Sequence, residues 1–271
     1  MSERPPHQPL SESECRRLYG ELSSKGARRD RGETLAEGWR LVERALRAGA
    51  DVKSVLLSDR AAARPSADEA RAIEAAVAAG VSLHSGSAEA LSALIGGRTY
   101  GDLIARVSLR GELDVNEPAL QRLLVGVDVL DPGNIGALWR TAHAMQVDAV
   151  LWVGGTDPLH PKSLRTSMGS CFRLPHAHWT MDSVAALERL SRAGWSNVAM
   201  ATGGGSTRVA AARAALWLGG EAHGLPQGVV ERADKVITIE TAEDCDSLSI
   251  NAAAAVGLHL IRAAQRDSKA T

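Results

Sequence analysis

The sequence predicts an α/β protein in which a C-terminal domain with a parallel sheet follows a smaller α/β domain. Apolar runs of strand length alternate with segments of helical spacing over most of the chain, which is typical of strand–helix–strand units. A charged segment without hydrophobic periodicity, RGELDVNEP, divides this alternation into two parts. Hydrophobic residues make up 45% of the 271 residues and aromatic residues only 3%, so we expect a core of Ala, Val, Leu and Ile.

Composition and charge weigh against several classes of protein. The formal net charge of -1 excludes a chain that coats nucleic acid by bulk charge, but it leaves room for a local basic patch. The cysteines, Cys15, Cys171 and Cys245, lie far apart and predict neither a disulfide framework nor a zinc site. No apolar run approaches the ~20 residues of a membrane span, and the polar start lacks the core of a signal peptide. We therefore expect a soluble cytoplasmic protein.

The N-terminal part is predicted to be a flexible tail, 1–29, followed by a small α/β domain, 30–110. The start of the chain is polar and proline-bearing and has little to bury. After the tail, four apolar residues stand at helical spacing: Leu35, Trp39, Val42 and Leu46. Ser66 is a candidate N-cap with Glu69 at the capping-box position. The other expected elements are strands at 52–58, 81–85 and 103–109 and helices at 66–80 and 87–94.

A linker at 111–118 and a second domain at 119–271 follow. The apolar runs of this domain are nearly continuous, as expected for strands that are buried on both faces of a sheet. We expect strands at 123–130, 148–154, 174–180, 197–202, 214–220 and 235–240. The expected helices are 136–146, 161–169, 182–193, 226–233 and 247–264. This repeated order of strand and helix predicts a parallel sheet with helices on both faces.

Loops with unusual residues follow several strands of the second domain. They read DPGNIGALWRTA at 131–142, ATGGGST at 201–207, GGEAHGLP at 219–226 and TAEDCDSLSINAAAA at 241–255. Ligands of open parallel sheets bind at the carboxyl ends of the strands. These loops are therefore the candidate site.

Each loop also has a purely structural interpretation. Arg140 follows Gly136 by about one turn, and it either contacts an anion or lies on a solvated helix face. Glu221 either accepts hydrogen bonds from a ligand or caps a helix that begins near Pro226. Ser247 is a candidate N-cap of an Ala-rich helix, whose small residues indicate close packing on another helix or a dimer interface.

Dinucleotide and metal sites are not supported by the pattern. Neither DPGNIG nor GGGST has the GxGxxG spacing of dinucleotide-binding folds, which weighs against an NAD-dependent oxidoreductase. His176 and His178 alternate on one candidate strand, and the other histidines are scattered. No metal-ligand spacing results, so no bound metal is expected.

Taken in order, the loops resemble the motifs of the SpoU (TrmH-like) family of SPOUT RNA 2′-O-ribose methyltransferases. The family pattern N-x-G-x-x-x-R-x-A is matched by Asn134, Gly136, Arg140 and Ala142. The pattern L-G-x-E-x-x-G-L is matched by Leu218, Gly219, Glu221, Gly224 and Leu225. The third pattern, S-L-N-V-S, reads Ser247, Leu248, Ser249, Ile250 and Asn251 here, with Asn and Ser exchanged. The resemblance covers about 123–264 and includes PKSLRTSMGS at 161–170, which is similar to the middle helix of the family.

The resemblance implies a particular fold and assembly. The C-terminal parallel-sheet SPOUT domain would contain a deep trefoil knot whose loops bind S-adenosylmethionine, and two knotted domains would pack as a homodimer. The phrase LAEGWRLVERALRAG looks like the opening of the small L30e-like domain that binds RNA substrate in this family. Because of this additional domain, rRNA is favoured over tRNA as the substrate.

The implied activity is transfer of a methyl group from S-adenosylmethionine to a ribose 2′-hydroxyl of RNA. By resemblance, the catalytic positions are Arg140, Asn134, Glu221 and Ser247. Arginine stays protonated in proteins, so Arg140 is better suited to stabilise an alkoxide or to grip a phosphate than to act as a base. The cofactor-binding positions are Ala201, Thr202, Gly203, Leu218, Gly219, Gly220, Glu221, Ile239, Ser247, Leu248 and Ser249. RNA contacts are expected from Lys25, Arg28, Arg29, Arg31 and Arg165, although the basic run before the first domain can equally be a solvated tether.

Two alternatives stay open. The exchanged third motif, in which Ser249 is shorter than the family asparagine, suggests a SPOUT-fold RNA-binding or regulatory protein with weak or no catalysis. The second alternative is an NAD-dependent oxidoreductase on a doubly wound sheet, which the missing glycine pattern disfavours. Binding of S-adenosylmethionine or of NAD discriminates between these functions.

Overall fold

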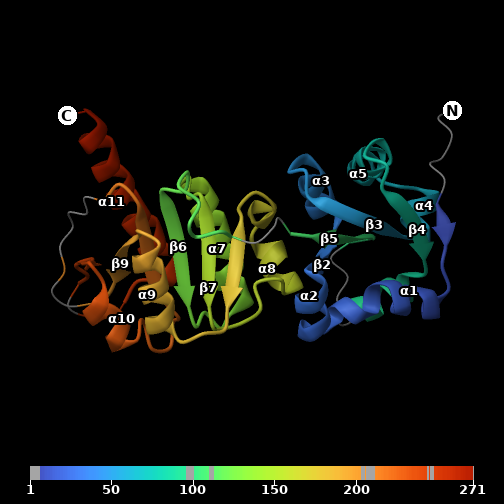
Figure 1. The fold of residues 1–271 in the computed structure, drawn as a ribbon. Helices are drawn as coiled ribbons and strands as arrows, with labels where there is room; N and C mark the ends of the chain where they lie inside the picture. The colour runs from blue at the N-terminus through green and yellow to red at the C-terminus, as the bar shows by residue number, and fades with distance from the viewer. Residues whose placement is uncertain are drawn as a thin grey trace. The chain divides into compact units, whose positions relative to one another are not determined.

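The computed structural model of the protein describes residues 7–95, 101–109, 113–202, 205, 211–242, 244 and 247–270. The part so described divides into two compact units, whose elements are labelled in Figure 1. The first unit comprises Met1–Arg110 and Leu159–Phe172, and the second comprises Gly111–Pro158 and Arg173–Thr271. A segment from the middle of the chain therefore belongs to the N-terminal unit. The linear domain boundaries suggested by the sequence stay a prediction.

The first unit contains, within the described residues, a mixed sheet of five strands in the order β1-β4-β3-β5-β2. These are β1 Gln8–Pro9, β2 Glu33–Glu37, β3 Asp51–Ser58, β4 Ser82–Gly86 and β5 Leu103–Ser108. β1 and β3 run parallel to β4, whereas β5 runs antiparallel to both β2 and β3. The strands predicted at 52–58, 81–85 and 103–109 are confirmed with small shifts at their ends.

Capping residues fix the starts of several helices in the first unit. Its helices are α1 Glu12–Tyr19, α2 Lys25–Arg31, α3 Trp39–Arg47, α4 Asp59–Ala63, α5 Ala67–Ala78, α6 Ala88–Leu94 and α8 Pro161–Thr166, with 3₁₀ turns η1 Gly20–Ser23 and η2 Ser170–Phe172. The predicted capping box of α5 is present, because Ser66 and Glu69 each accept from the other's backbone N–H. Ser87 caps α6 by accepting from the N–H of Ala90 at 3.1 Å. These local signals were sufficient to predict both helices.

The N-terminal segment predicted as a flexible tail is instead largely helical, as α1, η1 and α2. Cys15, Tyr19 and Leu22 are at most 1% exposed and pack in the core of the first unit. The Tyr19 hydroxyl also donates to Ser54 Oγ on β3 at 2.8 Å. The composition of the segment is polar because only one side of each helix is buried. Its few apolar residues are enough to anchor it.

The helix predicted from Leu35 to Leu46 begins later than its spacing suggested. Glu33–Glu37 forms β2, which is buried along its whole length and pairs with β5. Gly38 then adopts a φ of 85°, a left-handed conformation that favours glycine, and α3 follows it. Leu35 fits the helical period by coincidence, because the sheet pairing that decides its conformation comes from a strand far along the chain.

The second unit contains a parallel sheet, with six strands among the residues described, in the order β11-β9-β10-β6-β7-β8. Its strands are β6 Arg122–Val127, β7 Ala149–Val153, β8 His176–Trp179, β9 Ser196–Met200, β10 Ala214–Gly219 and β11 Lys235–Ile237. Every neighbouring pair is parallel. The predicted parallel sheet, including the less obvious strand at 174–180, is therefore confirmed.

Helices cover both faces of this sheet, as Figure 1 shows for α9 and α7. The helices of the second unit are α7 Pro132–Ala144, α9 Ser183–Arg192, α10 Gln227–Arg232 and α11 Ile250–Ala270. On one face, Leu187 and Leu190 of α9 and Val229 of α10 share a core cluster with alternate residues of the central strands. On the other face, α7 packs on α11, and Trp139 of α7 lies 5.7 Å from Trp152 of β7 between ring centroids.

The predicted linker at 111–118 is partly core, because its described residues include Leu113 at 9% exposure and Val115 at 3%. The carbonyl oxygen of Val115 accepts hydrogen bonds from Trp195 Nε1 at 2.8 Å and from Arg213 Nη2 at 2.7 Å. The interpretation as a plain linker was wrong for these residues. Two apolar side chains set among charges are too few to show a period in the sequence.

His176 on β8 is held neutral by its surroundings. Its ring lies edge-on to that of Trp139, with centroids 5.1 Å apart. The buried Nδ1 has no hydrogen-bond partner among the residues described. Burial, followed by the nearby His178, lowers the pKa of His176 to about 4, and Asp157 acts in the opposite direction.

We expect the protein to lose stability as the pH falls from about 6.5 to about 4. In this window the unfolded chain binds a proton at residue 176 and the folded chain does not. The free energy of unfolding should therefore decrease by about 3 kcal/mol over the window, and the stabilisation is fully present above it. Urea unfolding at several pH values measures the decrease, with His176→Gln as the comparison. An unchanged pH profile in that variant would contradict the assignment.

Candidate functional site at the carboxyl edge of the parallel sheet

The second sheet brings three of the predicted loops to one edge. β6, β10 and β9 are parallel neighbours, and β11 pairs with β9, so their carboxyl ends lie along the same edge. β6 leads into α7, β10 leads into the glycine loop at 219–226, and the described part of 241–249 leads from β11 into α11. Such an edge is where open parallel sheets bind ligands.

Side chains from these three loops form one hydrogen-bonded set. Asp131 caps α7 by accepting from the N–H of Gly133 at 3.0 Å, which sets Asn134 in the first turn. Asn134 Nδ2 donates to Glu221 Oε1 in the glycine loop. Asn251 Nδ2, in the first turn of α11, donates to Asn134 Oδ1 at 3.4 Å. We call Asn251–Asn134–Glu221 the amide chain. It connects the three motif loops through direct contacts.

The glycine loop can be built only with glycine at two positions. A Cβ on Gly219 would lie 1.9 Å from the carbonyl carbon of Gly224, and one on Gly220 would lie 2.2 Å from the backbone oxygen of Asp128. Gly220 N–H donates to Val127 O at 2.8 Å, and Gly224 N–H donates to Gly220 O at 2.9 Å. The backbone of the loop therefore packs directly against the end of β6.

Arg140 lies on the exposed side of α7, while its neighbours Leu138 and Trp139 are fully buried. Long helical side chains lean toward the N-terminus of their helix, which for α7 is the carboxyl edge of the sheet. The structure brings Asn134 and Glu221 together, but among the described residues it shows no hydrogen bond between Arg140 and the amide chain. The guanidinium is therefore available to a ligand at this edge.

The third motif starts α11 at a different residue from the one predicted. The helix begins at Ile250, and Ser249 is its cap, with Oγ accepting from the N–H of Ala252 at 3.3 Å. Ser247 was expected to be the N-cap and lies before that position, together with Leu248, which is 40% exposed. Only the capping geometry distinguishes the two serines, because both precede the same Ala-rich run.

The remaining predicted cofactor positions lie around the same strand ends, except Gly203, which is outside the described residues. Leu218 is buried in β10, Ile239 is half-buried and Thr202 is exposed. The backbone oxygen of Ala201 accepts from Thr238 Oγ1 at 2.9 Å. The predicted cofactor positions in this part of the edge therefore have uncharged side chains, and their backbone groups are the main polar groups.

The predicted RNA-binding residues are mostly engaged within the first unit. Arg28 is 3% exposed and donates to the backbone oxygens of Leu22 at 2.9 Å and Ser23 at 2.8 Å. Arg31 pairs with Glu21, and Arg165 pairs with Glu37 at 2.7 Å. Lys25 and Arg29 are exposed. The structure therefore favours a structural role for Arg28 and leaves Lys25 and Arg29 as the accessible members of the set.

Replacement of Arg165 by alanine is expected to lower the free energy of unfolding by about 2 kcal/mol. Glu37 is 7% exposed, and burial raises its pKa although Arg165 acts to lower it. Without Arg165, the buried carboxylate loses its partner. Chemical denaturation measures the loss, and adding Glu37→Gln should recover part of it. Reduced RNA affinity without any loss of stability would contradict this structural role.

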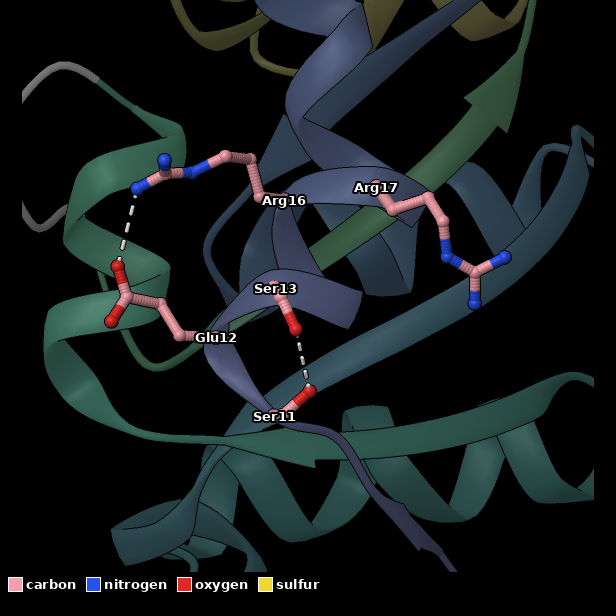
Figure 2. Close-up of a pocket in the computed structure, with 5 residues that line it drawn as sticks. All are labelled: Ser11, Glu12, Ser13, Arg16 and Arg17. Atoms are coloured by element: carbon pink, nitrogen blue, oxygen red, sulfur yellow. Dashed lines mark hydrogen bonds and ion pairs between the residues drawn. The ribbon is translucent and has the colours of Figure 1, made fainter.

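A hollow of about 620 Å³ on the first unit is lined by Ser11, Glu12, Ser13, Arg16 and Arg17 (Figure 2). Arg16 Nη2 is paired with Glu12 at 3.2 Å, and the hydroxyls of Ser11 and Ser13 lie 3.1 Å apart. These contacts belong to the exposed start of α1, which Ser11 caps. No residue of the predicted site lines this hollow.

The structure shows no metal-binding cluster and no membrane helix in the parts of the chain it describes. No group of three or more His, Cys, Asp or Glu side chains is arranged there to hold a metal ion. None of the helices described is long and apolar enough to cross a membrane.

The fold and the amide chain define an α/β protein with a parallel sheet and a candidate ligand site at the carboxyl edge of its strands. Residues 121–260 match the SpoU rRNA Methylase family, and residues 17–95 match the MRM3-like substrate binding domain. The chain belongs to the SpoU rRNA methylase family. The resemblance seen in the three loops is therefore confirmed.

Curated relatives agree with this family. The chain is 28% identical to the 23S rRNA (guanosine(2553)-2′-O)-methyltransferase RlmP of Bacillus subtilis, over 90% of this chain and 94% of the relative. It is 31% identical to the 23S rRNA (guanosine-2′-O-)-methyltransferase RlmB of Bordetella pertussis, over 69% of this chain and 80% of the relative. It spans only 63% of the length of an uncharacterized tRNA/rRNA methyltransferase of Mycobacterium bovis, at 29% identity over 62% of this chain.

Solved structures share the fold over nearly the whole chain. An RNA 2′-O ribose methyltransferase superposes with a TM-score of 0.75 at 26% identity, covering 96% of this chain and 99% of the other. The AdoMet-bound rRNA methyltransferase of Sinorhizobium meliloti gives a TM-score of 0.76 at 23% identity, covering 96% and 98%. These likenesses confirm the predicted α/β fold, while the trefoil knot stays a prediction.

Proposed function

We propose that the protein transfers a methyl group from S-adenosylmethionine to a ribose 2′-hydroxyl of RNA, with rRNA as the substrate. The observation that carries this proposal is the amide chain, which joins the three family motifs at the carboxyl edge of the sheet. Arg140 lies on the same helix, α7, as Asn134. The relatives in Bacillus subtilis and Bordetella pertussis are named as methyltransferases of 23S rRNA, which supports this substrate class.

The strand ends fit a nucleoside cofactor. The backbone at 201–202, 219–220 and 239 lies at separate strand ends, and residues 247–249 immediately precede α11. Gly219 and Gly220 pack against neighbouring backbone without side chains. Backbone N–H and C=O groups suit the polar edges of a nucleoside. S-adenosylmethionine, when bound, supplies a methyl group that its sulfonium has already activated.

The chain's own residues then have to place and polarise the hydroxyl. The positively charged guanidinium of Arg140 stabilises the negative charge that develops on the ribose oxygen while the hydroxyl proton passes to water at this exposed position. Glu221 accepts from Asn134, which holds the Asn134 amide in a single orientation at the site. Holding the reacting atoms in line supplies much of the acceleration.

The proposed function also includes an oligomeric state and a cellular location. Family resemblance supports a homodimer through the second unit, with a trefoil knot in each protomer, and an rRNA substrate supports a cytoplasmic location. Lys25 and Arg29, which are exposed on α2, are candidate phosphate contacts.

The test combines binding and transfer. Isothermal titration should give saturable binding of S-adenosylmethionine and none of NAD, and Glu221→Ala should weaken the binding. Incubation with unmodified rRNA, and with tRNA as the comparison, should then yield a 2′-O-methylated nucleotide in rRNA. Cofactor binding without transfer to either RNA would favour the regulatory alternative, and binding of NAD alone would favour an oxidoreductase.

A further inference from the structure

The Glu221 carboxylate at the end of the amide chain fixes the direction in which the hydrogen bonds of the chain run. The carboxylate of Glu221 only accepts hydrogen bonds, so Asn134 must turn Nδ2 toward it and leave Oδ1 as an acceptor. Asn251 then has to present its own Nδ2 to that oxygen, at 3.4 Å. The order of donors and acceptors therefore runs in one direction, from Asn251 through Asn134 to Glu221.

Asn251 reaches this position because of where α11 begins. Ser249 caps the helix, which places Asn251 in the first turn. α11 packs on α7, whose first turn holds Asn134. In the S-L-N-V-S pattern, the amide stands at position 249 and a hydroxyl stands at position 251. Exchanging the two residues moves the amide from the cap into the first turn, where it still contacts the site.

The second polar atom of the Asn251 amide, Oδ1, carries an energetic cost that packing alone does not explain. Asn251 Oδ1 is buried and has no hydrogen-bond partner within the part of the chain that the structure describes. A buried, unpaired amide oxygen destabilises a protein, and native structures that keep one call for a particular explanation. An apolar side chain at this position would not carry that cost.

We propose that Asn251 is a positioning residue, which orients Asn134 and through it the Glu221 carboxylate for methyl transfer. The exchanged third motif thus still places an amide in contact with Asn134, from position 251 instead of position 249. This inference rests on the proposed function, because its effect is seen in the rate of methyl transfer.

The test is a reciprocal exchange of the two residues. Asn251→Ser should lower kcat about tenfold, while KM for RNA and the Kd for S-adenosylmethionine stay within about threefold. Ser249→Asn should preserve the cap, since asparagine and serine cap helices equally well. The double variant Ser249→Asn/Asn251→Ser restores the family pattern and should recover kcat to within about threefold of the unmodified protein. The melting temperature of each variant is measured in parallel.

Asn116→Ser is the matched control, because it makes the same chemical change at an exposed turn that contacts Asp114. It should leave kcat unchanged. The inference is overturned if Asn251→Ser keeps its kcat, if its loss of kcat only follows a fall in melting temperature, or if the double variant does not recover. If the unmodified protein itself transfers no methyl group, the proposed function fails first and the inference fails with it.

Discussion

Replacement of Arg140 by alanine is expected to lower kcat for methyl transfer by about a hundredfold to a thousandfold, the range seen when one group that stabilises a developing oxyanion is removed. Arg140 is exposed on α7 and makes no hydrogen bond or ion pair with the other described residues that would hold it away from a ligand. The Kd for S-adenosylmethionine should change little, because the cofactor positions lie on other loops. Single-turnover transfer and isothermal titration measure the two quantities separately.

Two further variants sharpen this experiment. Arg140→Lys keeps the positive charge but loses the planar fork of donors, so it should recover little of the rate. Arg192→Ala, on the exposed side of α9 and on the other face of the sheet, is the matched control. A kcat for Arg140→Ala within about twofold of the unmodified protein would rule out a role for Arg140 in the transfer step.

Replacement of Gly219 by alanine is expected to abolish saturable binding of S-adenosylmethionine and to lower the free energy of unfolding by about 3 kcal/mol. The new Cβ would lie 1.9 Å from the carbonyl carbon of Gly224 and 2.1 Å from its oxygen. Both atoms are backbone, so the loop would have to change its path at the end of β10. Isothermal titration and urea unfolding report the two effects.

The control for this prediction is a glycine with space around it. A Cβ on Gly26 in α2 would meet no atom within 4 Å beyond its chain neighbours and its own helix backbone, so Gly26→Ala should retain full stability and cofactor binding. If Gly219→Ala bound S-adenosylmethionine as well as the unmodified protein, the glycine loop would not be part of the cofactor site.

Local signals predicted much of the fold. Strand runs and caps depend on residues close together in the sequence, and β3, α5 and the parallel strands of the second unit were found from them. The conformation of β2 depends on pairing with β5, which lies far along the chain, and helical spacing was misleading there. α1 was missed because its few buried residues stand among charges and give no clear period.

In the candidate site, too, some features could be predicted from the sequence and others depend on contacts that only the structure shows. The resemblance brought Asn134 and Glu221 to attention, and the structure places them in contact. The position of Asn251 could not be deduced, because it depends on which serine caps α11, and two serines in the same run satisfy the sequence signal equally well. The burial of Arg28 was equally hidden, since a basic run does not show which arginine folds inward to bind backbone oxygens.

The first unit is built from two separate segments of the chain, and this constrains the order in which the protein can fold during synthesis. Thr34 Oγ1 donates to the backbone oxygen of Leu159 at 2.6 Å, and Glu37 holds Arg165. A nascent chain that has just emerged through β5 still lacks both partners. Since chains leave the ribosome N-terminus first, the N-terminal unit can reach its final form only after β6, α7 and β7 have also emerged. The N-terminal unit is thus completed only after part of the second unit has been synthesised.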